Sequence, residues 1–254
     1  MRAIAILRLT MLVGLLATPA YAEIPVPQGC EVPAYLLTSE SALPKVAEAV
    51  KPSGKLNVLV IGSRSSVIGV SDQSAAYPAR LQTYLRDKFP KVDVNVSLEL
   101  QVKKTAEEMV PVLGKLVEER KPSLVIWQVG TVDAMRQIDA DDFRNALDEG
   151  VSAMKAAGTD VILMNLQYSP RTETMISGLA YLDNMRVVAQ QHDVPLFDRF
   201  AIMRQWNENG DFDLFSPSPG LELAKRVHDC LGRALSTFVV DAAHASPAEL
   251  RIQR

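Results

Sequence analysis

The chain of 254 residues is 48% hydrophobic and 22% charged, which is typical of one folded domain and excludes a disordered, collagen-like or repeat protein. Its formal charge of −3 becomes about −5 without the two arginines of the leader described below, because 25 Lys and Arg then stand against 30 Asp and Glu. The net negative charge of the chain would repel the phosphates of a nucleic acid, so we expect no nucleic-acid binding. Two cysteines are too few for a disulfide framework or a cysteine-rich zinc site.

Residues 1–22 have the pattern of a secretory signal peptide. Arg2 and Arg8 precede an apolar run, and Ala20-Tyr21-Ala22 provides a small-x-small cleavage site. An uncleaved membrane anchor would need about 20 apolar residues, and this run is much shorter. We therefore expect cleavage before Glu23, a periplasmic or secreted bacterial protein, and no stable membrane insertion after cleavage.

Residues 23–54 are expected to form an N-terminal arm that contains Cys30, while Cys230 lies near the end of the chain. In an oxidising compartment the two are expected to form a disulfide that ties the arm to the last helix. The alternative is that Cys230 is free and packs as a small apolar residue.

Residues 55–239 alternate short apolar runs with segments of helical period, which predicts a parallel sheet covered by helices on both faces. Strands are predicted at residues 56–61, 92–98, 124–127, 161–164 and 194–197. Helices are predicted at residues 77–89, 105–119, 143–157, 176–191, 199–206 and 221–239. The expected fold class is α/β, a three-layer α/β/α sandwich with a central, mainly parallel five-stranded sheet, followed by a tail at residues 240–254.

Ligands of such folds bind at the carboxyl ends of the strands. The loop after the first strand reads Gly62-Ser63-Arg64-Ser65-Ser66, a serine-rich turn that could present a nucleophilic hydroxyl beside backbone N–H groups. It could equally be a polar turn or an anion-binding helix start. It lacks the glycine spacing of nucleotide-binding loops.

Three ordered blocks resemble those of the SGNH (GDSL-like) hydrolases: this serine turn, then residues 126–133, then residues 163–170. The similarity spans about residues 55–237, and residues 194–204 are similar to the segment that precedes the last catalytic block of exported bacterial members. The resemblance implies the flavodoxin-like SGNH hydrolase fold and an ancestral activity on O-acyl esters. In that family the first block supplies a serine nucleophile, a later block an oxyanion-hole asparagine, and the last block an aspartate and a histidine base.

Carried over by position, the resemblance places Arg64 in the nucleophile slot and Val132 in the oxyanion asparagine slot. Neither side chain can perform that role. Gly62, Gly130 and Asp133 do match the family and are expected to keep their places in the site. The second block of the family usually has a glycine that donates its backbone N–H to the oxyanion. It falls on residues 98–104 of this chain, which contain no glycine, so this second oxyanion donor is not expected.

The last block fits two registers, and both lose the histidine. In the favoured one, Pro219 takes the place of the aspartate and Glu222 that of the base. In the other, Asp213 is kept and Ser216 replaces the base. The favoured register predicts that Arg64 and Glu222 face each other and form a salt bridge in the old cleft.

The expected function is therefore that of a catalytically degenerate member, leaning towards no enzyme activity, which binds an envelope polysaccharide or a protein partner. The alternative is an active serine esterase or O-acetyl hydrolase that uses a relocated nucleophile, Ser65 or Ser63, on acyl esters of envelope polysaccharides. A scaffold without a ligand is a third possibility.

An active enzyme would need a base, and none is in register. His192, His228 and His244 are all expected at the surface, and Arg64 beside Glu222 would lower the pKa of that carboxylate and weaken it as a base.

No cofactor or metal is expected. The acidic group Asp139-Asp141-Asp142 is typical of the first turn of a helix. Trp127 and Trp206 are expected in the core, although either could line a sugar-binding cleft.

Overall fold

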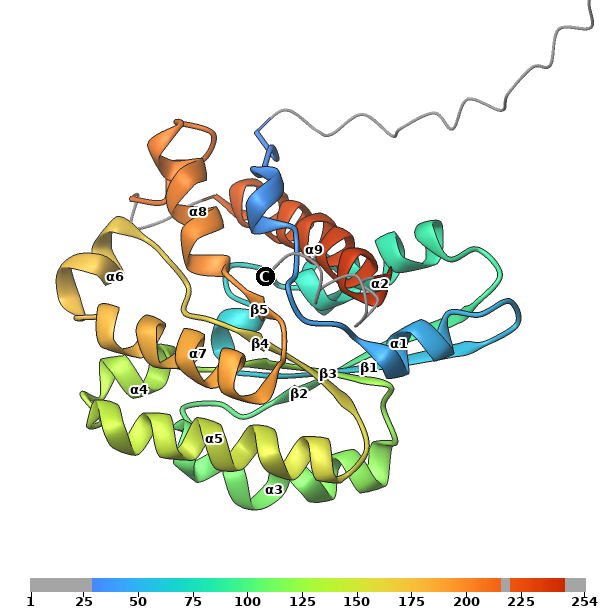
Figure 1. Cartoon of the computed structure of the whole chain (residues 1–254). Coiled ribbons are helices and arrows are strands. Elements are labelled where there is room, and N and C mark those ends of the chain that lie inside the picture. The colour runs from blue at the N-terminus through green and yellow to red at the C-terminus, as the bar shows by residue number, and fades with distance from the viewer. Residues whose placement is uncertain (1–28, 216–219, 245–254) are drawn as a thin grey trace, which may run out of the picture.

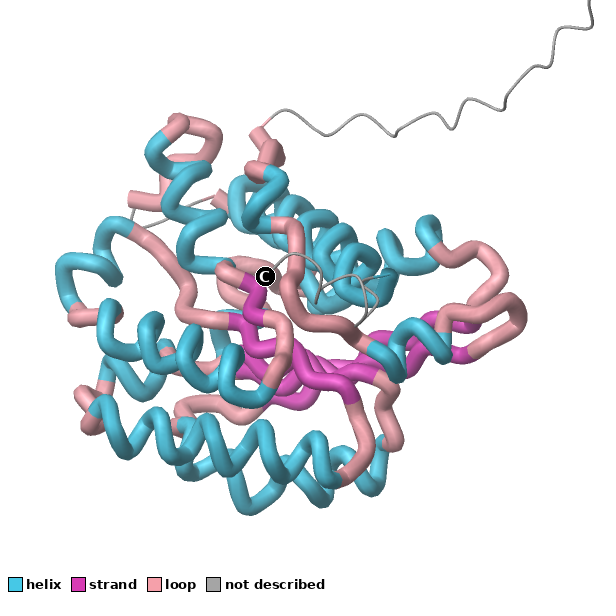
Figure 2. Tube along the Cα trace, viewed as in Figure 1, coloured by secondary structure: helices cyan, strands magenta, loops and turns pink. Residues whose placement is uncertain are grey.

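The computed structural model describes residues 29–215 and 220–244, in which a five-stranded sheet lies between two layers of helices (Figures 1 and 2). The strands are β1 Lys55–Gly62, β2 Asp93–Leu100, β3 Leu124–Gln128, β4 Asp160–Met164 and β5 Leu196–Phe197. Their spatial order is β2-β1-β3-β4-β5, and all the described pairings are parallel. The predicted α/β/α fold class is confirmed.

The α-helices of the described chain cover both faces of this sheet. They are α1 Pro44–Ala49, α2 Tyr77–Lys88, α3 Ala106–Arg120, α4 Thr131–Met135, α5 Ala140–Ala156, α6 Pro170–Met175, α7 Leu179–His192, α8 Arg199–Glu208 and α9 Leu221–His244. Helices α3, α5 and α7 pack on one face, and α1, α2, α8 and α9 pack on the other (Figure 1).

Strand β1 shows why its sequence forms a buried central strand. Its side chains alternate between the two cores, with Val58 and Val60 on the side of α2 and α9 and Leu59 and Ile61 on the side of α3 and α5. A strand buried on both faces reads as a continuous apolar run, which is the signal that predicted it.

Helices α1, α4 and α6 were not predicted, because segments of five or six residues are too short to show a helical period. Helix α9 continues to His244 instead of ending at residue 239, since Ala242 and Ala243 are buried and the Leu43 N–H donates to the Ala242 carbonyl at 3.0 Å. Residues 240–244 of the expected tail are therefore helical. The expected leader and residues 245–254 lie outside the described residues.

The N-terminal arm is fastened along α9. A disulfide joins Cys30 to Cys230, with 5.2 Å between their Cα atoms, which confirms the predicted pairing. The Ser39 N–H donates to the Asp241 carboxylate at 2.8 Å, and the indole N–H of Trp206 donates to the Glu31 carbonyl at 2.9 Å. In the described residues, no helix combines the length and apolarity needed to cross a membrane.

The disulfide closes a separation of 200 residues, so its loss should increase the conformational freedom of the unfolded chain considerably. We expect the double substitution Cys30→Ala and Cys230→Ala to lower the free energy of unfolding by about 2–5 kcal/mol, measured by equilibrium urea denaturation. A reducing agent should shift the midpoint of the wild type towards that of the variant and leave the variant unchanged. Equal midpoints for the oxidised wild type and the variant would contradict this role.

Candidate functional site

The serine turn follows the carboxyl end of β1 and is shaped by Gly62. A Cβ atom at this position would lie 2.3 Å from the Ser66 hydroxyl, so only glycine allows the turn to fold back so closely. Ser66 is fully buried and Ser63 nearly so, whereas Arg64 is exposed. The residue in the nucleophile slot of the family therefore points away from the buried part of the turn.

Gln128, the last residue of β3, organises the hydroxyls of this turn. Its Nε2 donates to the Ser65 Oγ at 2.6 Å, while its Oε1 accepts from the Ser66 hydroxyl at 2.9 Å and from the Tyr77 hydroxyl at 2.9 Å. The Ser63 and Ser65 hydroxyls lie 3.2 Å apart. Sequence reasoning missed Gln128; its signal is a polar residue that ends an otherwise apolar buried strand.

His228 lies in the core and not at the surface, so that prediction was wrong. Its Nδ1 accepts the Tyr77 N–H at 3.1 Å, and its Nε2 therefore carries the proton and donates to the Ile68 carbonyl at 2.9 Å. Burial lowers the pKa of this imidazole, and the positive charge of Arg199 lowers it further. Both ring nitrogens are occupied by backbone groups, so His228 cannot act as the base for a serine in this arrangement.

The two other histidines are far less buried. His192 is partly exposed and lies 2.7 Å from the Asp148 carboxylate, and His244 is exposed at the end of α9.

The turn after β3 carries the remaining family positions. Gly130 has a φ of 96°, and a Cβ there would lie 2.7 Å from a methyl group of Leu166, so glycine is required. Asp133 is buried and its Oδ1 accepts the Ala106 N–H at 2.7 Å, which fixes the start of α3, while burial raises the pKa of this carboxyl. Val132 offers no side-chain donor.

The space between the serine turn and the turn after β3 is small. A recess of about 10 Å³ is bounded by Ser63, Lys104, Met109, residues 128–132 and Asp133, which is room for about one water molecule. In the loop after β2, the Gln101 N–H donates to the Gly62 carbonyl at 2.7 Å and is not free to stabilise an oxyanion.

The salt bridge expected between Arg64 and Glu222 is not formed. Glu222 is exposed at the start of α9 and pairs with Lys225 at 2.9 Å, three residues away on the same helix, and within the described chain Arg64 makes no ion pair. A partner on the same helical face is always within reach, whereas a pair across the cleft needs two long side chains to be held in place. Pro219 and Ser216, which distinguish the two registers, lie outside the described residues, and Asp213 is exposed and accepts the Phe215 N–H at 3.1 Å.

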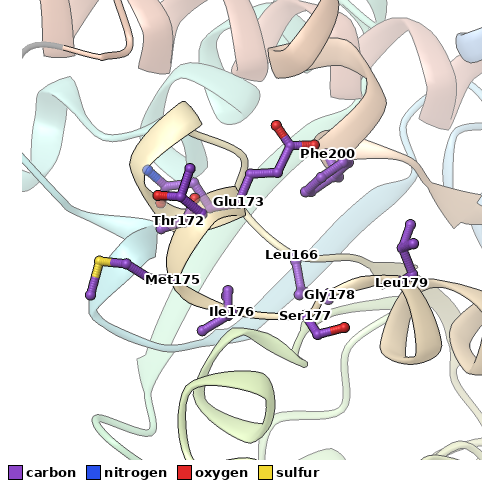
Figure 3. Close-up of a pocket in the computed structure, with 11 residues that line it drawn as sticks. Leu166, Thr172, Glu173, Met175, Ile176, Ser177, Gly178, Leu179 and Phe200 are labelled. Carbon is purple, nitrogen blue, oxygen red and sulfur yellow. The ribbon is translucent and has the colours of Figure 1, made fainter.

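A cavity of about 430 Å³ opens next to this edge, between α6, the start of α7 and the start of α8 (Figure 3). Leu166, Ile176, Leu179 and Phe200 give it apolar walls, and Glu173, whose carboxylate is turned towards Phe200, is its charged residue. Polar groups of Gln167, Thr172, Thr174 and Ser177 complete the lining, together with Met175 and Gly178. The Gln167 N–H contacts the Thr131 hydroxyl at 3.4 Å, so the cavity adjoins the turn after β3.

Comparison with known proteins agrees with this fold. The model of the non-GDSL lipase-like family matches residues 29–245. The chain belongs to this family. No curated protein sequence matches the chain.

Solved structures with the same fold belong to SGNH/GDSL hydrolases and related esterases. TesA is 23% identical, with 70% of this chain and 97% of that chain covered and a TM-score of 0.56. The lipase/acylhydrolase from Enterococcus faecalis is 17% identical, with coverages of 71% and 93% and a TM-score of 0.58. A catalytic mutant of Axe2, an acetylxylan esterase from Geobacillus stearothermophilus, is 19% identical, with coverages of 77% and 99% and a TM-score of 0.60. The expected SGNH hydrolase fold is confirmed.

The other residues singled out in this non-GDSL lipase-like chain have structural places. Both Trp127 and Trp206 are fully buried, as predicted, and neither lines the cavity of Figure 3. Asp139 caps α5 by accepting the N–H groups of Asp141 and Asp142, which accounts for the acidic cluster.

The buried neutral His228 should make the fold sensitive to acid. Its folded-state pKa is lowered, whereas in the unfolded chain it returns to about 6.5, so below that pH the unfolded state binds more protons. The contribution of His228 to stability is complete above about pH 6.5 and is lost as the pH falls towards the folded-state pKa. The expected slope is at most about 1.4 kcal/mol per pH unit.

The measurement is urea denaturation from pH 7.5 to 5.0 of the wild type and of His228→Asn, which keeps an acceptor for the Tyr77 N–H and does not titrate. The stability advantage of the wild type should shrink below pH 6.5. An advantage that stays constant across this range would show that His228 is not held neutral by the fold.

Proposed function

We propose that this protein is exported, has lost the serine-hydrolase chemistry of its fold, and acts in the cell envelope by binding. The observation that carries this proposal is the hydrogen bonding of the serine turn. Ser65 and Ser66 are engaged by the Gln128 amide, and the neighbouring imidazole of His228 is engaged by two backbone groups.

Serine hydrolysis needs a hydroxyl, a base that removes its proton, and donors aimed at the developing oxyanion. The amide Nε2 of Gln128 is itself a donor to Ser65, and an amide is no base at neutral pH. Val132 adds no side-chain donor, and the recess beside it holds about one water molecule. These features favour binding over ester cleavage.

Export is supported by the leader pattern and by the Cys30–Cys230 disulfide. Disulfides form and persist in oxidising compartments and are rare in the cytosol. We propose a periplasmic or secreted location.

The cavity of Figure 3 is the place we propose for the ligand. Its volume of about 430 Å³ falls within the usual range of small-molecule sites, and it lies at the carboxyl edge of the sheet. The Glu173 carboxylate disfavours a phosphorylated ligand. Apolar walls with polar groups at their margins suit an uncharged saccharide unit of an envelope glycan, and one structural neighbour is named an acetylxylan esterase.

The absence of catalysis is tested by fluorophosphonate labelling, because such probes react with activated serines without requiring the natural substrate. We expect no adduct on Ser63, Ser65 or Ser66 in the intact mass and peptide map of the mature protein, while an active SGNH esterase labelled in parallel is modified stoichiometrically. A stoichiometric adduct on any of the three would establish a working nucleophile and refute the proposal.

The cavity is tested with a matched pair of glycine substitutions. Gly178 has an ordinary φ, and a Cβ there would be in normal contact with Leu166, so Gly178→Leu should extend into the cavity without backbone strain. Gly114→Leu adds the same side chain on α3, where a Cβ would meet nothing within 4 Å. With an acetylated xylo-oligosaccharide as probe, followed by isothermal titration calorimetry, Gly178→Leu should weaken binding at least about tenfold and Gly114→Leu should not.

If the wild type binds this probe and both variants bind it equally well, the cavity is not the site. If the wild type binds no saccharide and instead retains a protein from envelope extract, the partner is a protein and the glycan proposal fails.

A further inference from the structure

Arg199, the first residue of α8, is a buried cation for which the described residues provide no hydrogen-bond or ion-pair partner. Its side chain is 1% exposed, and two of its guanidinium nitrogens, Nε and Nη2, are buried without any hydrogen bond. Within the described chain no carboxylate forms an ion pair with it. Folded proteins rarely leave a buried charge in this condition, because its desolvation is then uncompensated.

The other arginines of the described residues that have a buried nitrogen without a hydrogen bond each lie beside a polar side chain that compensates for it. The Nε of Arg80 lacks a hydrogen bond but lies 3.6 Å from the Asp229 carboxylate. Arg233 donates through Nη2 to the Tyr84 hydroxyl at 3.2 Å and stacks over the same ring. Among the arginines of the described residues, this condition is therefore specific to Arg199.

The groups around Arg199 do not supply a negative charge. The Asp198 carboxylate, next to it in sequence, accepts from Asn165 and from the Ala201 N–H and pairs with Arg186. Burial raises the pKa of the Tyr77 hydroxyl, which therefore stays protonated, and lowers the pKa of His228, which stays neutral. Burial lowers the pKa of Arg199 only to about 10, so its guanidinium is charged at neutral pH.

The positions of the two unsatisfied nitrogens indicate the kind of ligand that would complete them. The N–H bonds of Nε and Nη2 lie along one edge of the planar guanidinium and point in nearly the same direction, which matches the two oxygens of a carboxylate. The unsatisfied part of Arg199 is thus one complete bidentate edge. A neutral acceptor such as one water molecule would satisfy the hydrogen bonds only in part and would leave the charge uncompensated.

We propose that Arg199 is the anchor of a buried site for a small carboxylate anion of the size of acetate. The site is separate from the cavity of Figure 3, whose lining residues do not include Arg199. It lies where β5 ends and α8 begins, at the carboxyl edge of the sheet, where parallel α/β folds bind their ligands. The positive end of α8 adds to the attraction for an anion.

The site is connected to the serine turn. Tyr77 is an electrostatic neighbour of Arg199, and it also donates to Gln128 through its hydroxyl and to His228 through its N–H. An anion that fixes the guanidinium should therefore stabilise the same hydrogen-bond network that holds Ser65 and Ser66.

The experiment measures the thermal unfolding midpoint of the full mature chain in increasing sodium acetate, with the ionic strength held constant by sodium chloride. Acetamide, which has nearly the shape of acetate without its charge, serves as the neutral control. We expect acetate to raise the midpoint by about 5–10 °C at a hundredfold excess over its Kd. Acetamide should leave it unchanged, and ¹³C-labelled acetate should show a bound NMR signal.

Two substitutions on α8 make the test specific. Arg199→Met should fold at least as stably as the acetate-free wild type, since it replaces an uncompensated buried charge with an apolar side chain of similar length, and it should lose the response to acetate. Arg204→Met removes an exposed arginine that pairs with Glu208 on the same helix and should keep the full response. Arg199→Lys, which retains the charge but not the bidentate edge, should respond more weakly.

Loss of the acetate response only in the Arg199 variants would establish the site. Equal responses in the wild type and in Arg199→Met, or no response in either, would overturn the proposal. An equal response to acetamide would also overturn it, because the charge would then play no part. None of these outcomes bears on fluorophosphonate labelling or on saccharide binding, so the anion site and the proposed function can fail independently.

Discussion

The side-chain amide of Gln128 holds together segments that are far apart in the sequence. It ends β3, accepts from Ser66 in the turn after β1 and from Tyr77 at the start of α2, and donates to Ser65. These groups are buried or partly buried, and a polar group left there without a hydrogen bond would lower the stability of the fold by about 1–3 kcal/mol. The conformation of the serine turn and the position at which α2 begins therefore depend on this one amide.

The hydrogen bonds of this network run in one consistent direction. Tyr77 and Ser66 donate to the Gln128 Oε1, and the amide Nε2 donates to Ser65. Ser65 consequently accepts a hydrogen bond through the oxygen that would have to become a nucleophile. A base would have to take the remaining hydroxyl proton, and the other hydrogen-bond partner of the Ser65 hydroxyl in the described chain is the hydroxyl of Ser63, at 3.2 Å.

Much of the fold could be predicted from the sequence, because strands buried on both faces read as short apolar runs and the longer helices show a clear period. The position of His228 could have been predicted too. It lies on the face of α9 that also carries Ala224 and Leu231, three or four residues away, and this face is buried against α2. Glu222, six residues earlier, lies on a different face of the helix and is exposed.

The candidate site was harder to predict, because its features depend on contacts between elements. The ion pair between Arg64 and Glu222 looked plausible from matched positions, but the preference of Glu222 for Lys225 is decided by side-chain geometry along α9. Gln128 gave a signal that can be used elsewhere, a polar residue at the end of a buried strand. Arg199 gave none, since an arginine after Asp198 at the start of an amphipathic helix is normally a surface residue.

The distribution of satisfied and unsatisfied polar groups separates two kinds of protein that share this fold. A hydrolase keeps its nucleophile beside a base and leaves oxyanion donors free, at some expense in stability. Here the Ser65 and Ser66 hydroxyls and both nitrogens of His228 are satisfied within the described chain. The buried side-chain atoms left without a hydrogen bond there include the Oδ2 of Asp133 on α4 and two nitrogens of Arg199, a cation at the start of α8. A group of this kind is completed by an anion and performs no proton transfer, because its pKa of about 10 keeps it charged at neutral pH. The hydrogen bonds of Ser65, Ser66 and His228 are therefore the physical basis of the binding function that we propose.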